Sequence, residues 1–108
     1  MPLTSLNALS PLDGRYFSKT ASLSDLFSEF GLIRLRLRVE IEWLKALARA
    51  PDIAEVPGFS PATVGQLDAL VADFSEGDAE AVKAIEARTN HDVKALEYWL
   101  KERLAANT

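Results

Sequence analysis

An apolar stripe that repeats at three- and four-residue steps limits the folds open to this chain. Its members are Leu26, Phe30, Ile33, Leu37, Ile41, Leu44 and Ala48. Within the stripe, residues 34–43 alternate charged and apolar side chains, which is typical of a half-buried strand. Length favours a helix, because a strand rarely exceeds about ten residues. The sequence therefore predicts one long helix from about residue 24 to residue 49.

This predicted helix carries two further patterns. Arg36 with Glu40, and Arg38 with Glu42, are four residues apart, so each pair is expected to interact across one turn. A second apolar stripe on a neighbouring face consists of Leu32, Leu35, Val39, Trp43 and Ala46. A domain of four or five helices can cover the first stripe. The second, together with Trp99 and Leu104, is expected to stay exposed and to draw a second copy of the chain, because soluble monomers seldom leave a large apolar patch bare.

Capping residues and prolines mark the other helix boundaries. In chain order they are Ser22 with Asp25, Ala50-Pro51, Ser60-Pro61, Ser75 to Asp78, and Thr89 with Asp92. Residues 1–20 contain several turn-forming residues and are expected to form a loop segment, whereas residues 21–108 are expected to form one helical domain. The predicted fold class is therefore all-α, with four to five helices.

Charge bears on the possible partners. The chain has 108 residues and a formal net charge of -4, which argues against a protein whose main partner is nucleic acid. Arg34, Arg36 and Arg38 could form a basic stripe for nucleic acid. Glu40 and Glu42 follow at once, so a solvated or ion-paired helix face is favoured.

Metal sites and membrane targeting are also constrained by composition. The chain has no cysteine and one histidine, too few nitrogen or sulfur ligands for a metal site of the zinc type. The opening residues lack the basic segment of a secretory signal, and no stretch approaches the roughly 18 consecutive apolar residues of a spanning helix. The sequence predicts a cytoplasmic protein without a membrane partner.

Asp13-Gly14-Arg15-Tyr16 is the first candidate site. The glycine turn places a guanidinium and a phenol side by side, and arginine suits the forked recognition of a phosphate group. A surface turn with an exposed arginine and a packed tyrosine explains the same residues.

Thr89-Asn90-His91-Asp92 is the second candidate site. It combines an amide, the only histidine and a carboxylate at a predicted helix start, where free backbone N–H groups favour anions. Capping alone would explain Thr89 and Asp92, and a lone histidine is more often structural or solvated than catalytic. From the residues alone, both interpretations of each site stay open.

Several segments together resemble the bacterial adenylosuccinate lyase family of the fumarase/aspartase superfamily. Residues 10–16 read Ser-Pro-Leu-Asp-Gly-Arg-Tyr, and residues 89–98 read Thr-Asn-His-Asp-Val-Lys-Ala-Leu-Glu-Tyr. Between them, residues 27–32, 40–44 and 55–57 fall in the order and spacing of that family. The resemblance runs nearly end to end, and two separated motifs with a collinear middle are more specific than either motif alone.

The resemblance implies an enzyme of purine synthesis that eliminates fumarate from adenylosuccinate, giving AMP, and from the succinyl-aminoimidazole-carboxamide ribotide. It implies no metal or organic cofactor, and a homotetramer for the full-length protein. In the family, the residues that match Arg15 and Tyr16 hold the nucleotide phosphate. Those that match Asn90, His91 and Asp92 line the nucleotide pocket, so all five are expected to bind substrate, with no proton-transfer role for His91.

The family's segments for elimination chemistry lie further along than Thr108. These are the TSED-type segment, the general-acid histidine and the serine loop, so no catalytic residue is expected in this chain. Residues 100–108 also lack a C-cap glycine or proline, which favours a cut within a longer protein. Two hypotheses follow: the amino-terminal piece of a lyase, inactive alone, or a non-catalytic helical binding or oligomerisation module.

Overall fold

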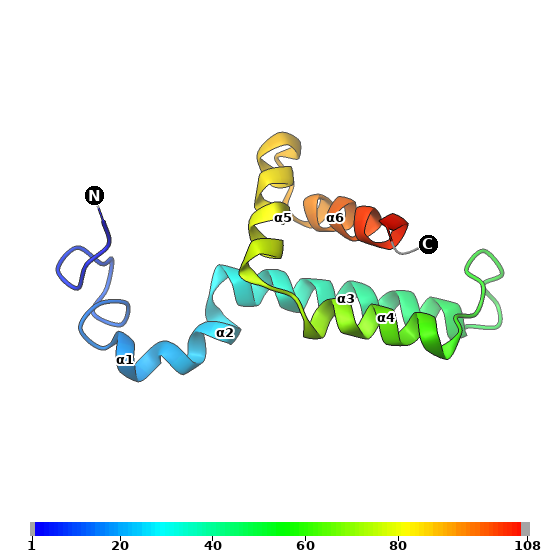
Figure 1. Cartoon of the computed structure of the whole chain (residues 1–108), viewed down its shortest axis with the longest axis horizontal. Coiled ribbons are helices and arrows are strands. Elements are labelled where there is room, and N and C mark those ends of the chain that lie inside the picture. The colour runs from blue at the N-terminus through cyan, green and yellow to red at the C-terminus, as the bar shows by residue number, and fades with distance from the viewer. Residues whose placement is uncertain (1, 107–108) are drawn as a thin grey trace. The chain divides into compact units, whose positions relative to one another are not determined.

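The structure is a computed structural model that describes residues 2–106. Its helices are α1 (Phe17–Thr20), the 3-10 turn η1 (Ala21–Leu23), α2 (Ser24–Phe27), α3 (Glu29–Arg49), α4 (Pro61–Ala72), α5 (Glu76–Thr89) and α6 (Asp92–Ala106). Figure 1 shows only helices and connecting segments over the described residues, of which α3 to α6 are the long helices. The predicted all-α fold class is confirmed. By compactness the chain divides into two units, residues 1–32 and residues 33–108.

The predicted single helix from 24 to 49 is wrong at Ser28. This residue is extended, with φ −82° and ψ 168°, so α2 ends at Phe27 and α3 begins at Glu29. The Ser28 hydroxyl accepts a hydrogen bond from the Gly31 N–H at 3.0 Å. Serine thus caps the new helix by satisfying one of its free N–H groups. A Cβ on Gly31 would lie 2.5 Å from the Asp25 carbonyl oxygen, so the close approach of the two segments requires glycine.

The amino-terminal unit is built from turns and very short helices. The segment 1–20, which is expected to form a loop, contains the short helix α1. Ser22 does not cap a helix, since α2 follows the 3-10 turn and has no side-chain cap. None of the residues in α1, η1 or α2 is buried. Leu6 and Leu9 are each 99% exposed. This unit therefore gains little from apolar burial.

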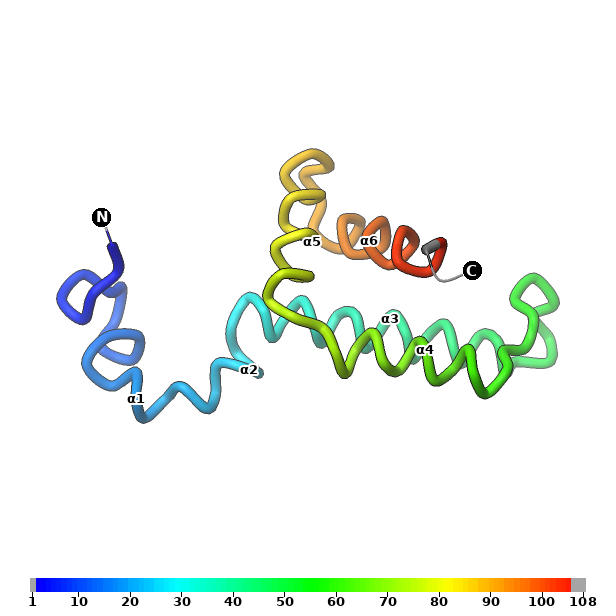
Figure 2. The backbone as a smooth tube through the Cα atoms, viewed as in Figure 1, coloured from blue at the N-terminus to red at the C-terminus, as the bar shows by residue number. Residues whose placement is uncertain are grey.

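The predicted helix boundaries in the second unit are confirmed where they depend on serine and proline. Helix α3 ends at Arg49, just before Pro51, and Ser60 caps α4 by accepting the Thr63 N–H at 3.1 Å. Ser75 and Asp78 form a reciprocal capping box at the start of α5. Figure 2 follows the backbone as it reverses direction between α3 and α4.

The core of the second unit comes from one face of each long helix. Its largest fully buried side chains are Leu37, Ile41, Leu67 and Leu96. Helices α5 and α6 pack against each other. The Phe74 and Trp99 rings meet edge to face, with centroids 5.3 Å apart. In Figure 1, α4 runs beside α3, and Lys45 Nζ of α3 lies 2.7 Å from Asp68 Oδ1 of α4.

The second apolar stripe of α3 is exposed, as the sequence predicts. The expectation that Trp99 belongs to the same exposed surface is wrong, because its ring packs against Phe74 and is only 3% exposed. Val39 is 66% exposed and Trp43 is 61% exposed. With Leu35, Arg38, Glu42 and Ala46 they line a shallow hollow of about 450 Å³. Within residues 2–106, no helix combines the length and the apolar character needed to cross a membrane.

The two ion pairs predicted along α3 do not form between these residues. Arg36 instead reaches Asp92, and Glu42 lies 2.9 Å from Lys45. For Arg36, an ion pair with another helix forms in place of one along α3. Exposed ion pairs between residues four apart contribute only about 0.3–0.5 kcal/mol, so they are easily replaced.

Candidate functional site

The amino-terminal turn, residues 13–16, is held by backbone contacts. The Tyr16 N–H donates to the Pro11 carbonyl at 2.8 Å. A Cβ on Gly14 would lie 2.7 Å from the Ser5 carbonyl oxygen, so glycine is required for this close approach. The turn places the Arg15 guanidinium carbon 5.1 Å from the centre of the Tyr16 ring, within cation–π range.

Both predicted phosphate-binding side chains of this turn are exposed. Tyr16 is 40% exposed, and Arg15 forms no ion pair with any residue between 2 and 106. A guanidinium that stacks on an aromatic ring keeps its N–H groups in its own plane, where they can donate to a phosphate. The arrangement is therefore able to bind an anion through Arg15, with the phenol of Tyr16 as a neighbouring donor.

The α5–α6 turn, residues 89–92, contains a left-handed residue. Asn90 has φ 55° and ψ 29°, and its N–H donates to the Glu86 carbonyl at 2.7 Å. Asparagine tolerates this conformation better than most residues other than glycine, so Asn90 ends α5 in the way a glycine commonly does. Thr89 is the last residue of α5, so the prediction that it caps the following helix is wrong.

His91 is the residue that caps α6. Its Nδ1 accepts the Lys94 N–H at 3.2 Å, and its carbonyl accepts the Ala95 N–H at 3.0 Å. An accepting Nδ1 carries no proton, so the neutral ring carries its proton on Nε2. His91 is exposed, which leaves that N–H able to donate to a ligand.

Asp92 begins α6 and has both carboxylate oxygens engaged. Oδ2 lies 2.6 Å from Arg36 Nη1, and Oδ1 accepts the Val93 N–H at 2.8 Å. The bond from Arg36, followed by the bond from the Val93 N–H, holds the pKa of Asp92 below its ordinary value. Sequence reasoning assigned Arg36 to a solvated or ion-paired helix face. No local signal points to Asp92 as its partner, because the two residues are 56 positions apart.

The five predicted site residues fall into two groups. Arg15 and Tyr16 belong to the amino-terminal unit, whereas Asn90, His91 and Asp92 are consecutive in the second unit. All five are exposed. Each of the three in the α5–α6 turn also has a structural role: Asn90 ends α5, His91 caps α6 and Asp92 pairs with Arg36. The alternative interpretation allowed for a structural histidine, but it assigned capping to Thr89 and Asp92. Their role in substrate binding stays a prediction.

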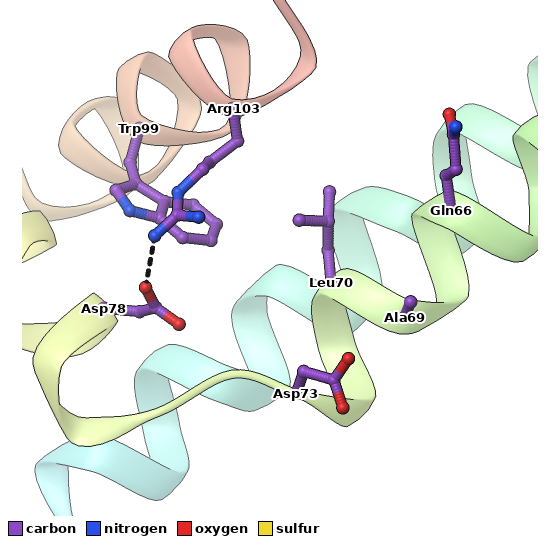
Figure 3. A pocket seen from close by; sticks show the side chains of 7 residues that line it. All are labelled: Gln66, Ala69, Leu70, Asp73, Asp78, Trp99 and Arg103. Atoms are coloured by element: carbon purple, nitrogen blue, oxygen red, sulfur yellow. Dashed lines mark hydrogen bonds and ion pairs between the residues drawn. The ribbon is translucent and has the colours of Figure 1, made fainter. Parts of the chain in front are cut away.

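A separate hollow of about 290 Å³ lies between α4, α5 and α6 (Figure 3). It is lined by Gln66, Ala69, Leu70, Asp73, Asp78, Trp99 and Arg103. Arg103 Nη2 lies 2.6 Å from Asp78 Oδ1, and the Arg103 guanidinium carbon lies 5.2 Å from the centre of the Trp99 ring. None of the five predicted residues lines this hollow. Asp78 and Arg103 are engaged with each other, so they brace α5 against α6 at the end opposite the α5–α6 turn.

A second hollow, of about 510 Å³, is formed by residues of α5 and α6 and includes Thr89, next to the turn. Its other lining residues are Ile85, Arg88, Tyr98, Lys101, Glu102 and Ala105. None of the five predicted residues lines it. Over residues 2–106, no group of three or more histidine, aspartate or glutamate side chains is placed to hold a metal ion.

No protein-family model matches the chain. Curated proteins that match nearly all of it are lyases. The chain is 54% identical over 105 residues to "Adenylosuccinate lyase" of Escherichia coli (strain K12), which covers 97% of this chain and 23% of that protein. It is 57% identical over 106 residues to the adenylosuccinate lyase of Vibrio cholerae serotype O1, covering 98% of this chain and 23% of that protein.

A third such lyase, from Haemophilus influenzae, is 55% identical over 104 residues, covering 96% of this chain and 23% of that protein. The chain thus spans about a quarter of the length of the curated relatives that it matches. The resemblance predicted from the motifs is confirmed: the chain is similar to the amino-terminal part of adenylosuccinate lyases.

Proposed function

We propose that this chain forms the amino-terminal segment of an adenylosuccinate lyase and supplies residues of its nucleotide site. The complete enzyme eliminates fumarate from adenylosuccinate, giving AMP, and from succinyl-aminoimidazole-carboxamide ribotide in purine synthesis. The observation that carries the proposal is the similarity to lyases of this name over 97% of the chain. The exposed donors of both turns support it, because anionic nucleotides are recognised by such groups.

Within this proposal all five site residues belong to the nucleotide pocket, with Asp92 lining it beside Asn90 and His91. Arg15 donates a forked pair of hydrogen bonds to the nucleotide phosphate, and Tyr16 adds its hydroxyl. Asn90 and the Nε2–H of His91 donate to polar groups of the nucleotide. His91 is given no part in proton transfer, because its Nδ1 already caps α6.

The 108-residue chain alone is proposed to be inactive. Elimination of fumarate needs a base for the carbon proton and an acid for the departing nitrogen, held together in one site. Neither turn offers such a pair. The chain therefore contributes binding and orientation, and the acid and base come from the rest of the enzyme.

Fumarate release tests both parts of the proposal. The 108-residue chain is expected to release no fumarate from either substrate. A complete lyase in which this chain replaces the matching segment of the Escherichia coli protein is expected to release it from both. An inactive but folded hybrid would contradict the lyase assignment. Release by the short chain, lost in His91→Ala, would contradict its inactivity.

One observation favours a second candidate, an oligomerisation module. The exposed stripe that includes Leu35, Val39 and Trp43 has the character of an interface. Sedimentation of the 108-residue chain at micromolar concentration tests whether it self-associates. A dimer that Trp43→Glu disperses supports self-association through α3, and a monomer excludes self-association. The homotetramer of the full-length protein and its cytoplasmic location stay predictions.

A further inference from the structure

The ion pair between Arg36 and Asp92 connects two distant parts of the second unit. Arg36 lies within α3, and Asp92 is the first residue of α6, 56 positions later. The separation of 2.6 Å between Nη1 and Oδ2 is that of a strong, charge-assisted hydrogen bond. The α5–α6 turn is thereby attached to α3 as well as to the two helices that it joins.

This attachment fixes the direction of the Asp92 carboxylate. One oxygen is held by Arg36, and the other accepts the N–H of Val93. With both oxygens engaged, the side chain cannot rotate without losing a hydrogen bond. Because Asn90 and His91 immediately precede it, holding Asp92 also limits the movement of their side chains.

The ion pair also changes the charge that a ligand meets at the turn. An unpaired carboxylate beside the turn would repel the phosphate and the carboxylates of an anionic nucleotide. The Arg36 guanidinium offsets that charge, and its side chain is 34% exposed, against 50% for Asp92. The low pKa of Asp92 agrees with a carboxylate that stays ionised and paired.

We propose that Arg36 is a positioning residue for nucleotide binding: it holds the Asp92 carboxylate, and through it the Asn90-His91-Asp92 turn, in the binding orientation. Arg36 itself need not touch the nucleotide. The inference rests on the proposed function, since it assigns a supporting residue to the same site.

The structure provides a matched control in Arg103. Its Nη2 also lies 2.6 Å from an aspartate in the first turn of a helix, Asp78, whose other oxygen accepts the Ser75 N–H. Both arginines therefore join two helices through the same kind of bond. Only Arg36 does so at the predicted site.

The experiment uses the complete lyase that carries this chain, with Arg36→Gln, Arg36→Lys and Arg103→Gln variants. Arg36→Gln is expected to raise the KM for adenylosuccinate by about tenfold, with a smaller change in kcat, as for other residues that orient a binding group. Arg36→Lys keeps the charge and is expected to recover part of that loss. Arg103→Gln is expected to lower Tm but to leave KM within about twofold.

Asp92→Asn separates failure of the inference from failure of the proposed site. If Arg36 acts through Asp92, the double variant Arg36→Gln/Asp92→Asn should have nearly the KM of Asp92→Asn alone. An unchanged KM in Arg36→Gln, with a raised KM in Asp92→Asn, would overturn the inference and leave the site standing. Unchanged KM values in Asp92→Asn and Arg15→Ala would overturn the proposed site and the inference with it.

Discussion

The amino-terminal turn and the α5–α6 turn both present exposed residues of the predicted site, but the two turns are held by different means. The first depends on backbone hydrogen bonds and on the close packing of Gly14 against Ser5, in a unit whose short helices bury no residue. The second joins two packed helices with a core beneath them, and is fixed further by the His91 cap and the Arg36–Asp92 pair.

Exposure and order are therefore separate properties of the two turns. Segments with little apolar burial open locally at low free energy, whereas segments tied to a core open only when the core does. In the α5–α6 turn the proposed binding groups are already held in place, so ligand binding there is expected to need less ordering.

Truncation of a core side chain should affect the two units most unequally. Leu96 is 1% exposed, so Leu96→Ala removes buried methyl groups and is expected to lower the free energy of unfolding by about 2–5 kcal/mol. Leu9→Ala, at a residue 99% exposed, should change it by less than about 0.5 kcal/mol. Urea unfolding of the 108-residue chain, followed by helical circular dichroism, measures both. Equal losses would show that the amino-terminal unit has a core of its own.

Loss of the Arg15 guanidinium should weaken nucleotide binding without destabilising the fold. In the complete lyase, Arg15→Ala removes a charge-assisted contact worth about 1.5–3 kcal/mol, and most of the effect should appear in KM. The control is Lys19→Ala, which removes an exposed cation four residues further on. If Arg15→Ala leaves KM and kcat unchanged, Arg15 is an ordinary surface arginine.

The parts of the fold that were predictable from sequence depend on short-range chemistry. Ser60 before Pro61, and Ser75 three residues before Asp78, mark helix starts through contacts within a single turn. The break at Ser28 was hidden because the apolar periodicity continues across it. Periodicity reports which side faces the core and does not reveal an interruption in the backbone hydrogen bonds.

The sequence suggests residues for the candidate site, whose binding role stays a prediction, but it does not reveal their local structural roles. Threonine is one of the residue types preferred at the start of a helix and histidine is not, yet His91 caps α6. Arg36 has acidic neighbours on its own helix, so nothing local indicates a partner 56 positions away. Such long-range pairs depend on how the helices pack, and short-range patterns in the sequence do not reveal that packing.

A substitution at Asn90 can separate its backbone role from its side-chain role. Asn90→Ala places a Cβ-bearing residue without a polar side chain in the left-handed region, which should lower the free energy of unfolding by about 1–2 kcal/mol. Asn90→Gly suits that conformation and should preserve the turn. If the amide binds nucleotide, Asn90→Gly in the complete lyase should raise KM while Tm stays near that of the parent. An unchanged KM would limit Asn90 to ending α5.

The smallest expected effect is the acid dependence of the Arg36–Asp92 pair, since both side chains are partly exposed and water screens their attraction. Arg36, as the largest cause, lowers the pKa of Asp92 below its ordinary value of 3.8. A carboxyl group with a lowered pKa in the folded state stabilises the fold above its unfolded pKa, and this stabilisation is lost as the pH falls through the folded value. The difference in unfolding free energy between the parent chain and Arg36→Gln should therefore be constant above about pH 5 and shrink below about pH 4.

The Asp92→Asn variant should show the same loss of acid dependence as Arg36→Gln, whereas Lys19→Ala should keep the acid dependence of the parent chain. Urea unfolding at a series of pH values measures all four proteins. A difference that does not change with pH would mean that Arg36 stabilises α6 through packing rather than through the Asp92 carboxylate, and the contrast between the two turns would then rest on the core and the His91 cap.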